Sequence, residues 1–110
     1  MKRNKLEQRH DKHIKKIWES PPIIGLEKIA LSSRETRMFY DDRLYHQSDN
    51  LCFDPFAGII YNIEYKTSNE HKHKAMKQLI EQKKFLKEMF NRKYNVVNLY
   101  VHNNYQIEVI

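Results

Sequence analysis

Two carboxylates and one lysine are the side chains of this sequence whose types and spacing best suit chemistry. They lie in the segment Ser48–Lys66, which reads SDNLCFDPFAGIIYNIEYK. Asp49 precedes a short apolar run and a turn, and a second apolar run then leads into Glu64 and Lys66. Two carboxylates can hold a divalent metal ion, and a lysine beside them can act on a metal-activated water or on a phosphate. With the basic character of the whole chain, this arrangement predicts a small metal-dependent nuclease.

Two antiparallel strands are expected to position these residues. Residues 50–54 and 59–66 are apolar runs on either side of residues 54–58, where proline and glycine favour a tight turn. Residues two apart in a strand project from the same face, so Glu64 and Lys66 should lie side by side. Their neighbours in the sequence are then free to pack against the opposite side.

Asp54 is a rival candidate for the first acid. It stands at the turn end of its strand, whereas Asp49 is expected to begin the strand that pairs with residues 59–66. In a hairpin closed at residues 54–58, residue 49 lies nearer to Glu64 than residue 54 does. The expected pairing therefore favours Asp49.

The first third of the chain is predicted to hold one clear helix. One helical face over residues 4–19 would carry Leu6, His10, Ile14, Ile17 and Trp18. Ser20-Pro21-Pro22 should end this helix, because proline lacks an amide donor. Residues 23–36 fit either a short helix or a strand. Residues 37–47 carry aromatic residues on both sides of Asp41-Asp42 and fit a strand or a hairpin.

A long helix and two further strands are expected after the Glu-x-Lys strand. Thr67 and Glu70 have the spacing of a capping box, and the apolar stripe that follows predicts a helix over residues 69–91. Residues 95–102 and 105–110 are predicted to be strands. The order helix, strands, helix, strands predicts an α/β fold with a central mixed sheet flanked by helices.

Length and cysteine content add to this expectation. The chain has 110 residues, which fits a single domain spanning residues 1–110 with a core of its own. The lone cysteine, Cys52, cannot form an internal disulfide, and this favours a reducing compartment. No apolar run approaches the roughly 20 residues that span a bilayer, and the N-terminus lacks the apolar core of a signal peptide. We therefore expect a cytoplasmic protein that does not engage a membrane.

The charge balance points to a polyanionic partner. The formal net charge is +6 and the sequence pI is about 9.4, values that favour nucleic acid or an anionic membrane surface. The membrane surface is disfavoured because the predicted helices carry no large aromatic-rich apolar face beyond what a core needs. The basic residues expected to contact phosphates are Lys72, Lys74 and Lys77 at the start of the second helix and Arg43 ahead of the motif. A solvated helix face is the alternative interpretation of the same lysines.

Two pairs of histidines are candidates for zinc ligands. His10 and His13 are three residues apart in a helix, whereas His71 and His73 do not share a helical face. A zinc site would need further nitrogen or sulfur ligands, and Cys52 lies in a core-like run. Exposed polar side chains are the favoured interpretation.

The motif and the order of elements resemble the PD-(D/E)XK nuclease superfamily, which includes type II restriction endonucleases and archaeal Holliday-junction resolvases. The family pattern is an acid on one strand and Asp/Glu-x-Lys on the next. Asp49, Glu64 and Lys66 match it, with residues 50–63 between the acids. Ser48 stands where proline often precedes the acid. The resemblance covers about residues 45–90. In the remainder of the chain, only the order of the elements matches.

This resemblance implies a restriction endonuclease-like αβββαβ core and a metal site. Asp49, Glu64 and the backbone carbonyl of Tyr65 would bind Mg²⁺ or Mn²⁺. Lys66 would orient or deprotonate the attacking water, or stabilise the charge that develops on the phosphate.

Other residues of this site are implied less specifically. Some family members place a glutamine on the helix after the Glu-x-Lys strand, and Gln78 is preferred over Gln82 because it lies nearer the helix start. Family members often carry a glutamate on the first helix, and Glu7, Glu19 and Glu27 all remain candidates.

The function implied is a Mg²⁺-dependent endodeoxyribonuclease. A chain of this size leaves no room for a target-recognition domain, so structure-specific or weakly sequence-specific cutting is expected. A homodimer is expected for cutting both strands of DNA. The alternative is a catalytically inactive nucleic-acid-binding or regulatory protein that retains the nuclease fold.

Overall fold

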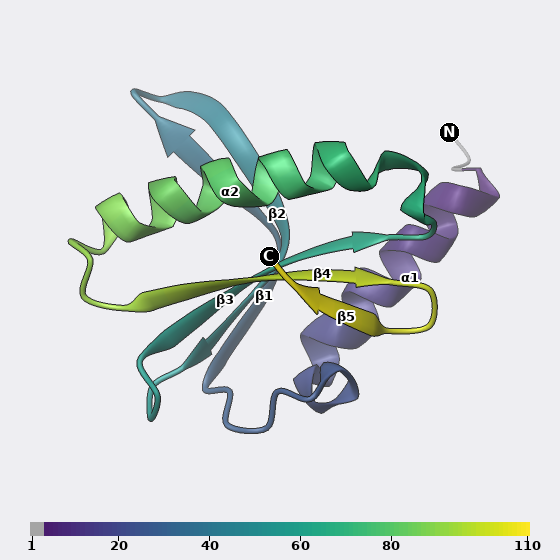
Figure 1. Cartoon of the computed structure of the whole chain (residues 1–110), viewed down its shortest axis with the longest axis horizontal. Helices are drawn as coiled ribbons and strands as arrows, with labels where there is room; N and C mark the ends of the chain where they lie inside the picture. The colour runs from purple at the N-terminus through teal and green to yellow at the C-terminus, as the bar shows by residue number, and fades with distance from the viewer. Residues whose placement is uncertain (1–3) are drawn as a thin grey trace.

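Within residues 4–110, which the computed structural model describes, five strands form one sheet and two α-helices pack against it (Figure 1). Residues 1–3 of the expected domain lie outside the described residues. The elements are α1 (Lys5–Glu19), the 3₁₀ turn η1 (Pro21–Ile24), β1 (Leu31–Tyr40), β2 (Arg43–Asp54), β3 (Ile59–Lys66), the 3₁₀ turn η2 (Asn69–His71), α2 (Lys72–Met89), β4 (Asn95–His102) and β5 (Gln106–Val109).

The strands lie in the sheet in the order of the sequence. β1, β2 and β3 form an antiparallel meander, β4 runs parallel to β3, and β5 returns antiparallel to β4. Parallel neighbours need a crossover, and α2 provides it between β3 and β4. The expected α/β fold with a mixed sheet flanked by helices is therefore confirmed.

The two helices pack on opposite faces of the sheet because the side chains of β3 alternate. Ile63 points to one face and is buried with Ile14 and Ile17 of α1. Ile60 points to the other face and is buried with Leu86 of α2. The period of two along β3 thus divides one apolar strand between two cores.

The first helix is confirmed, and the segment after it contains both a short helix and a strand. Asn4 caps α1 by accepting a 2.8 Å hydrogen bond from the backbone N–H of Glu7. After α1, the 3₁₀ turn Pro21–Ile24 ends at Gly25, which has a φ of +81°. β1 then begins at Leu31.

The hairpin of β1 and β2 is longer than expected and extends past α2 (Figure 1). Asp41 and Asp42 form its turn, with φ values of 48° and 63°. Residues 50–54 pair with β3, whereas residues 43–48 pair with β1 alone. The expectation that Asp49 begins a strand is therefore wrong, because pairing with β1 extends β2 back to Arg43.

The second half of the chain follows the predicted strands closely. β3 and β4 have the predicted bounds, and β5 is slightly shorter than predicted. The predicted capping box at Thr67 and Glu70 is wrong, because neither η2 nor α2 has a side-chain cap at its start. A 3₁₀ turn occupies this position instead, and the side chain of Asn69 accepts a 2.9 Å hydrogen bond from the hydroxyl of Tyr100. Among residues 4–110, neither helix combines the length and the apolar character that crossing a membrane requires.

Candidate active site

The candidate acids meet where β2 and β3 separate. The antiparallel pairing of these strands extends to Asn50 opposite Ile63, so Asp49 and Glu64 occupy the next facing positions. Both side chains are buried, with exposed fractions of 8% and 5%. The hairpin register therefore brings together the two acids that the sequence paired.

Asp54 has a different role at the turn. Its Oδ1 accepts hydrogen bonds from the backbone N–H groups of Phe56, at 2.9 Å, and Ala57, at 3.0 Å. An aspartate that binds amides two and three residues ahead stabilises the turn it begins. Asp54 is thereby held at the far end of the hairpin from Glu64.

The backbone N–H and carbonyl groups of Tyr65 have no partner in β2, and side chains bond to them instead. Oδ2 of Asp49 accepts a 2.7 Å hydrogen bond from the Tyr65 N–H, and Nε2 of His10 lies 3.0 Å from the Tyr65 carbonyl oxygen. Buried backbone groups must find partners, and here two side chains replace the missing strand. His10 comes from α1, so the site joins the first helix to the end of β3.

His10 also contacts the carboxylate of Asp49 directly. Its Nε2 lies 3.3 Å from Oδ2 of Asp49. A carbonyl and a carboxylate oxygen can only accept, so Nε2 carries the hydrogen. The hydrogen bond to Asp49, followed by the charge of Asp49, raises the pKa of His10, although burial opposes this shift. The Nε2–H of His10 thus lies beside two oxygens that were expected to bind metal.

Glu64 and Lys66 lie on the same face of β3, as predicted from strand geometry. Nζ of Lys66 is 3.5 Å from Oε1 of Glu64. Oε2 of Glu64 is buried and has no hydrogen-bond partner within the described residues. Burial, followed by repulsion from Asp49, raises the pKa of Glu64 to about 8, and Lys66 offsets only part of that increase. This carboxyl group therefore lacks a nearby positive charge strong enough to keep it ionised at neutral pH.

The donor set fits a hard divalent cation. Two carboxylates and a backbone carbonyl are oxygen ligands that Mg²⁺ accepts, with waters completing its coordination. The unpartnered Oε2 of Glu64 is the observation that supports this fit. Within residues 4–110, no group of three or more histidine, cysteine, aspartate or glutamate side chains is arranged to hold a metal ion. A bound ion would therefore rely on Asp49, Glu64 and the Tyr65 carbonyl.

Gln82, the other candidate glutamine of α2, hydrogen-bonds to β3. Gln82 is buried, and its Oε1 accepts a 3.0 Å hydrogen bond from Asn62 of β3. Gln78 lies one turn earlier on α2 and is half-buried. The amide of Asn62 also reaches Asn98 of β4, at 3.2 Å, and so links α2 to both central strands.

The three candidate glutamates all lie elsewhere. Glu7 completes the capping box at the start of α1, and Glu19 forms an ion pair of 3.7 Å with Lys15. Glu27 is exposed in the loop before β1. His10 is the residue of α1 that reaches the site. The sequence feature that could have identified His10 is its position on the apolar face of the helix, because residues on that face normally point toward the core.

The predicted phosphate contacts are dispersed. Nζ of Lys72 is engaged with Glu108 of β5, at 2.9 Å from Oε1. Lys74 and Lys77 are exposed on α2, and Arg43 is exposed at the tip of the hairpin. Lys74 and Lys77 are therefore the available cations of this set nearest to the start of α2.

Comparison with known proteins provides no relative: no family model, no characterised protein and no solved structure matches the chain. The interpretation of the site therefore depends on its own geometry.

Proposed function

We propose that this protein is a Mg²⁺-dependent endodeoxyribonuclease of the PD-(D/E)XK type that hydrolyses phosphodiester bonds. The observation that carries the proposal is the meeting of Asp49 and Glu64 at the end of β3, where Oε2 of Glu64 is buried without a partner. A carboxylate pair of this kind becomes favourable when a cation is shared between its members.

The residues have distinct roles in this proposal. Asp49, Glu64 and the Tyr65 carbonyl would hold the metal ion, whose charge activates water and stabilises the transition state. The Tyr65 carbonyl has two lone pairs, so its hydrogen bond with His10 leaves one free. Lys66, on the same face as Glu64, would orient or deprotonate the attacking water.

His10 takes the place that the family resemblance assigned to a glutamate of the first helix. It contacts Asp49 and Tyr65 from α1, as a residue around the metal would. We propose that His10 positions the Asp49 carboxylate and the Tyr65 peptide rather than reacting with substrate.

DNA is the proposed substrate, cut with structure specificity or weak sequence specificity. The net charge of +6 supports a polyanionic partner, and one small domain offers limited surface for reading bases. A homodimer would allow both strands of a duplex or junction to be cut.

Cleavage assays on defined DNA test this proposal. Duplex, single-stranded, flapped and four-way-junction substrates would be incubated with Mg²⁺ or Mn²⁺. We expect Asp49→Asn, Glu64→Gln and Lys66→Met each to reduce cleavage at least about 100-fold, the scale on which lost transition-state stabilisation acts. Asp54→Asn is the matched control, since Asp54 binds only the turn, and should cut like the wild type. Unchanged cleavage in all three site variants would overturn the proposal.

A nucleic-acid-binding protein that does not cut is the second candidate. It is favoured by His10, which already places a cation-forming group between Asp49 and the Tyr65 carbonyl. This alternative predicts DNA binding without any cleavage, and no stabilisation of the fold by Mg²⁺.

A further inference from the structure

A basic cleft lies beside the candidate active site. The first turns of α1 and the β4–β5 turn enclose about 750 Å³. Lys5, Arg9 and Lys12 line it from α1, and Asn103 and Asn104 line it from the turn. The three cations are four and three residues apart, so they form one stripe along the helix. Among residues 4–110, the charged side chains that line the cleft are all basic.

The cleft and the site are neighbours through two residues. Tyr65 lines the cleft, while its peptide N–H and carbonyl are bound by Asp49 and His10. Arg9, which also lines the cleft, directly precedes His10 in α1. Glu64 lies on the α2 face of the sheet and the Tyr65 side chain on the α1 face, so a strand whose phosphate lay at Asp49 and Glu64 would pass around the end of β3 to bring its neighbouring phosphates to the cleft.

The lining chemistry selects a phosphodiester backbone. An arginine can bind two phosphate oxygens at once, and lysines act as point charges. The amide groups of Asn103 and Asn104 add neutral hydrogen-bond donors. Such groups neutralise phosphates without reading base edges.

We propose that this cleft binds the backbone phosphates of the substrate strand next to the phosphate that is cut. This inference rests on the proposed nuclease function, and it assigns the principal DNA contact to α1 instead of to α2.

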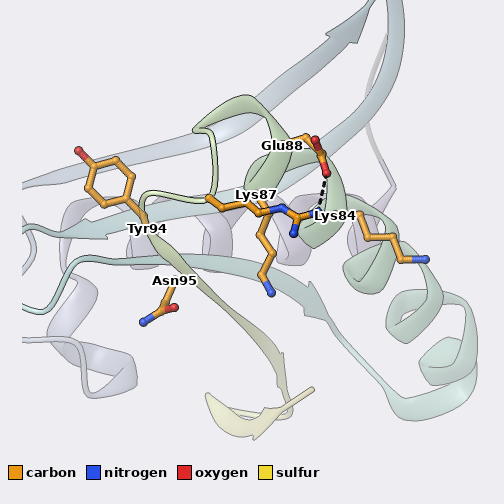
Figure 2. A pocket seen from close by; sticks show the side chains of 6 residues that line it. Lys84, Lys87, Glu88, Tyr94 and Asn95 are labelled. Carbon is orange, nitrogen blue, oxygen red and sulfur yellow. Dashed lines mark hydrogen bonds and ion pairs between the residues drawn. The ribbon is translucent and has the colours of Figure 1, made fainter.

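A second basic pocket, of about 390 Å³, lies at the opposite end of the sheet and provides a control (Figure 2). Lys84 and Lys87 line it, and the dashed line in Figure 2 marks the ion pair that joins Glu88 to Arg92 at 3.3 Å. It also contains Asn95, which pairs with the first residue of β3, whereas the active site lies at the last residues of that strand. This pocket is also basic, although Glu88 offsets one of its cations, and it is remote from the proposed chemistry.

Binding in EDTA separates the cleft from catalysis. Fluorescence anisotropy of labelled single-stranded and duplex DNA would be measured for Arg9→Ala/Lys12→Ala and for Lys84→Ala/Lys87→Ala, which remove equal charge. We expect the α1 pair to weaken binding about tenfold or more and to reduce the salt slope by roughly 0.7 to 0.9 per lost contact, with the smaller value for single strands. The α2 pair should weaken binding less than about threefold, the residual expected from long-range charge alone.

Three controls keep the result interpretable. Arg9→Lys/Lys12→Arg should retain binding, and thermal unfolding should show that the exposed alanine substitutions leave the fold intact. Equal losses of DNA affinity in the α1 and α2 double variants would overturn the proposal. It would also be overturned if polyglutamate displaced DNA as effectively, per charge, as unlabelled DNA does. Because no metal is present, loss of binding in the α1 pair would support the cleft even if the cleavage assays failed.

Discussion

The carboxylate of Asp49 accepts a 2.7 Å hydrogen bond from the backbone N–H of Tyr65. This bond replaces the strand pairing that β3 loses where β2 turns away. Asp49 therefore has a structural role in addition to its proposed role as a metal ligand, and substitutions at this position must separate the two.

Asparagine and alanine at position 49 should differ in stability but not in activity. The asparagine side chain would keep an oxygen that can accept from the Tyr65 N–H, whereas alanine would leave that buried N–H without a partner. We expect Asp49→Ala to lower the free energy of unfolding by about 1–3 kcal/mol and Asp49→Asn by less than about 1 kcal/mol. Urea denaturation measures the difference in stability. DNA cleavage assays should show that both variants lose activity. Wild-type cleavage by Asp49→Asn would contradict the metal-ligand role.

Glu64 should make the protein less stable as the pH rises. Its pKa is raised from 4.5 to about 8, so between these values the folded state binds more protons than the unfolded state. The free energy of unfolding should therefore fall through this window, by up to about 1.4 kcal/mol per pH unit. Glu64→Gln should flatten this dependence. Thermal unfolding from pH 4.5 to 8.5 measures it, and parallel curves for the two proteins would contradict the pKa shift.

Mg²⁺ should stabilise the folded protein by binding to the carboxylate of Glu64. At pH 8, millimolar Mg²⁺ should raise the melting temperature of the wild type, because a ligand that binds only the folded state stabilises it. Glu64→Gln should lose most of this increase. The same increase in both proteins would place the bound ion at a different site.

His10 and His13 should show opposite pH trends, although both lie on α1. The hydrogen bond to Asp49 raises the pKa of His10, so its extra stabilisation is present below pH 6.5 and is lost as the pH rises through the folded value. Burial, with nearby cations, lowers the pKa of His13, so its contribution is lost as the pH falls. We expect His10→Ala to be more damaging at pH 5.5 than at pH 8.5, and His13→Ala to show the reverse. Thermal unfolding at both values compares them, and a shared trend would contradict the assignment.

Local patterns in the sequence predicted the centre of the fold well. β3 and β4 have the predicted bounds because they are bounded by clear turn residues and consist largely of apolar residues. Glu64 and Lys66 share a face because strand geometry requires it. The choice of Asp49 over Asp54 followed from hairpin register in the same way, and the register agrees with it.

Contacts between distant segments could not be predicted in this way. His10 reaches Tyr65 across 55 positions of the sequence, and no local period encodes that distance. The outer half of β2 forms because β1 pairs with it, although its residues do not alternate regularly. The hydrogen bond of Gln82 to Asn62 of β3 spans 20 positions, and it depends on how α2 packs on the sheet rather than on a local pattern.

The buried amide of Asn62 should be a major determinant of how α2 packs against the sheet. Its side chain bonds Gln82 at 3.0 Å, Asn98 at 3.2 Å and the hydroxyl of Ser48 at 2.7 Å. Asn62→Leu would leave these three buried groups short of a partner, so we expect a loss of about 3 kcal/mol in the free energy of unfolding. Asn95→Leu, the same change at an exposed position of β4, should cost less than about 0.5 kcal/mol.

Urea denaturation of both variants measures this difference. A double variant shows whether the loss comes from buried polar groups left without partners or from a leucine side chain that does not fit the site. Asn62→Leu/Gln82→Leu removes one of the stranded partners as well, so it should be less destabilised than the sum of the two single variants. Simple additivity would mean that the amides do not act as one network. A loss below about 1 kcal/mol in Asn62→Leu alone would show that water satisfies these groups when Asn62 is removed.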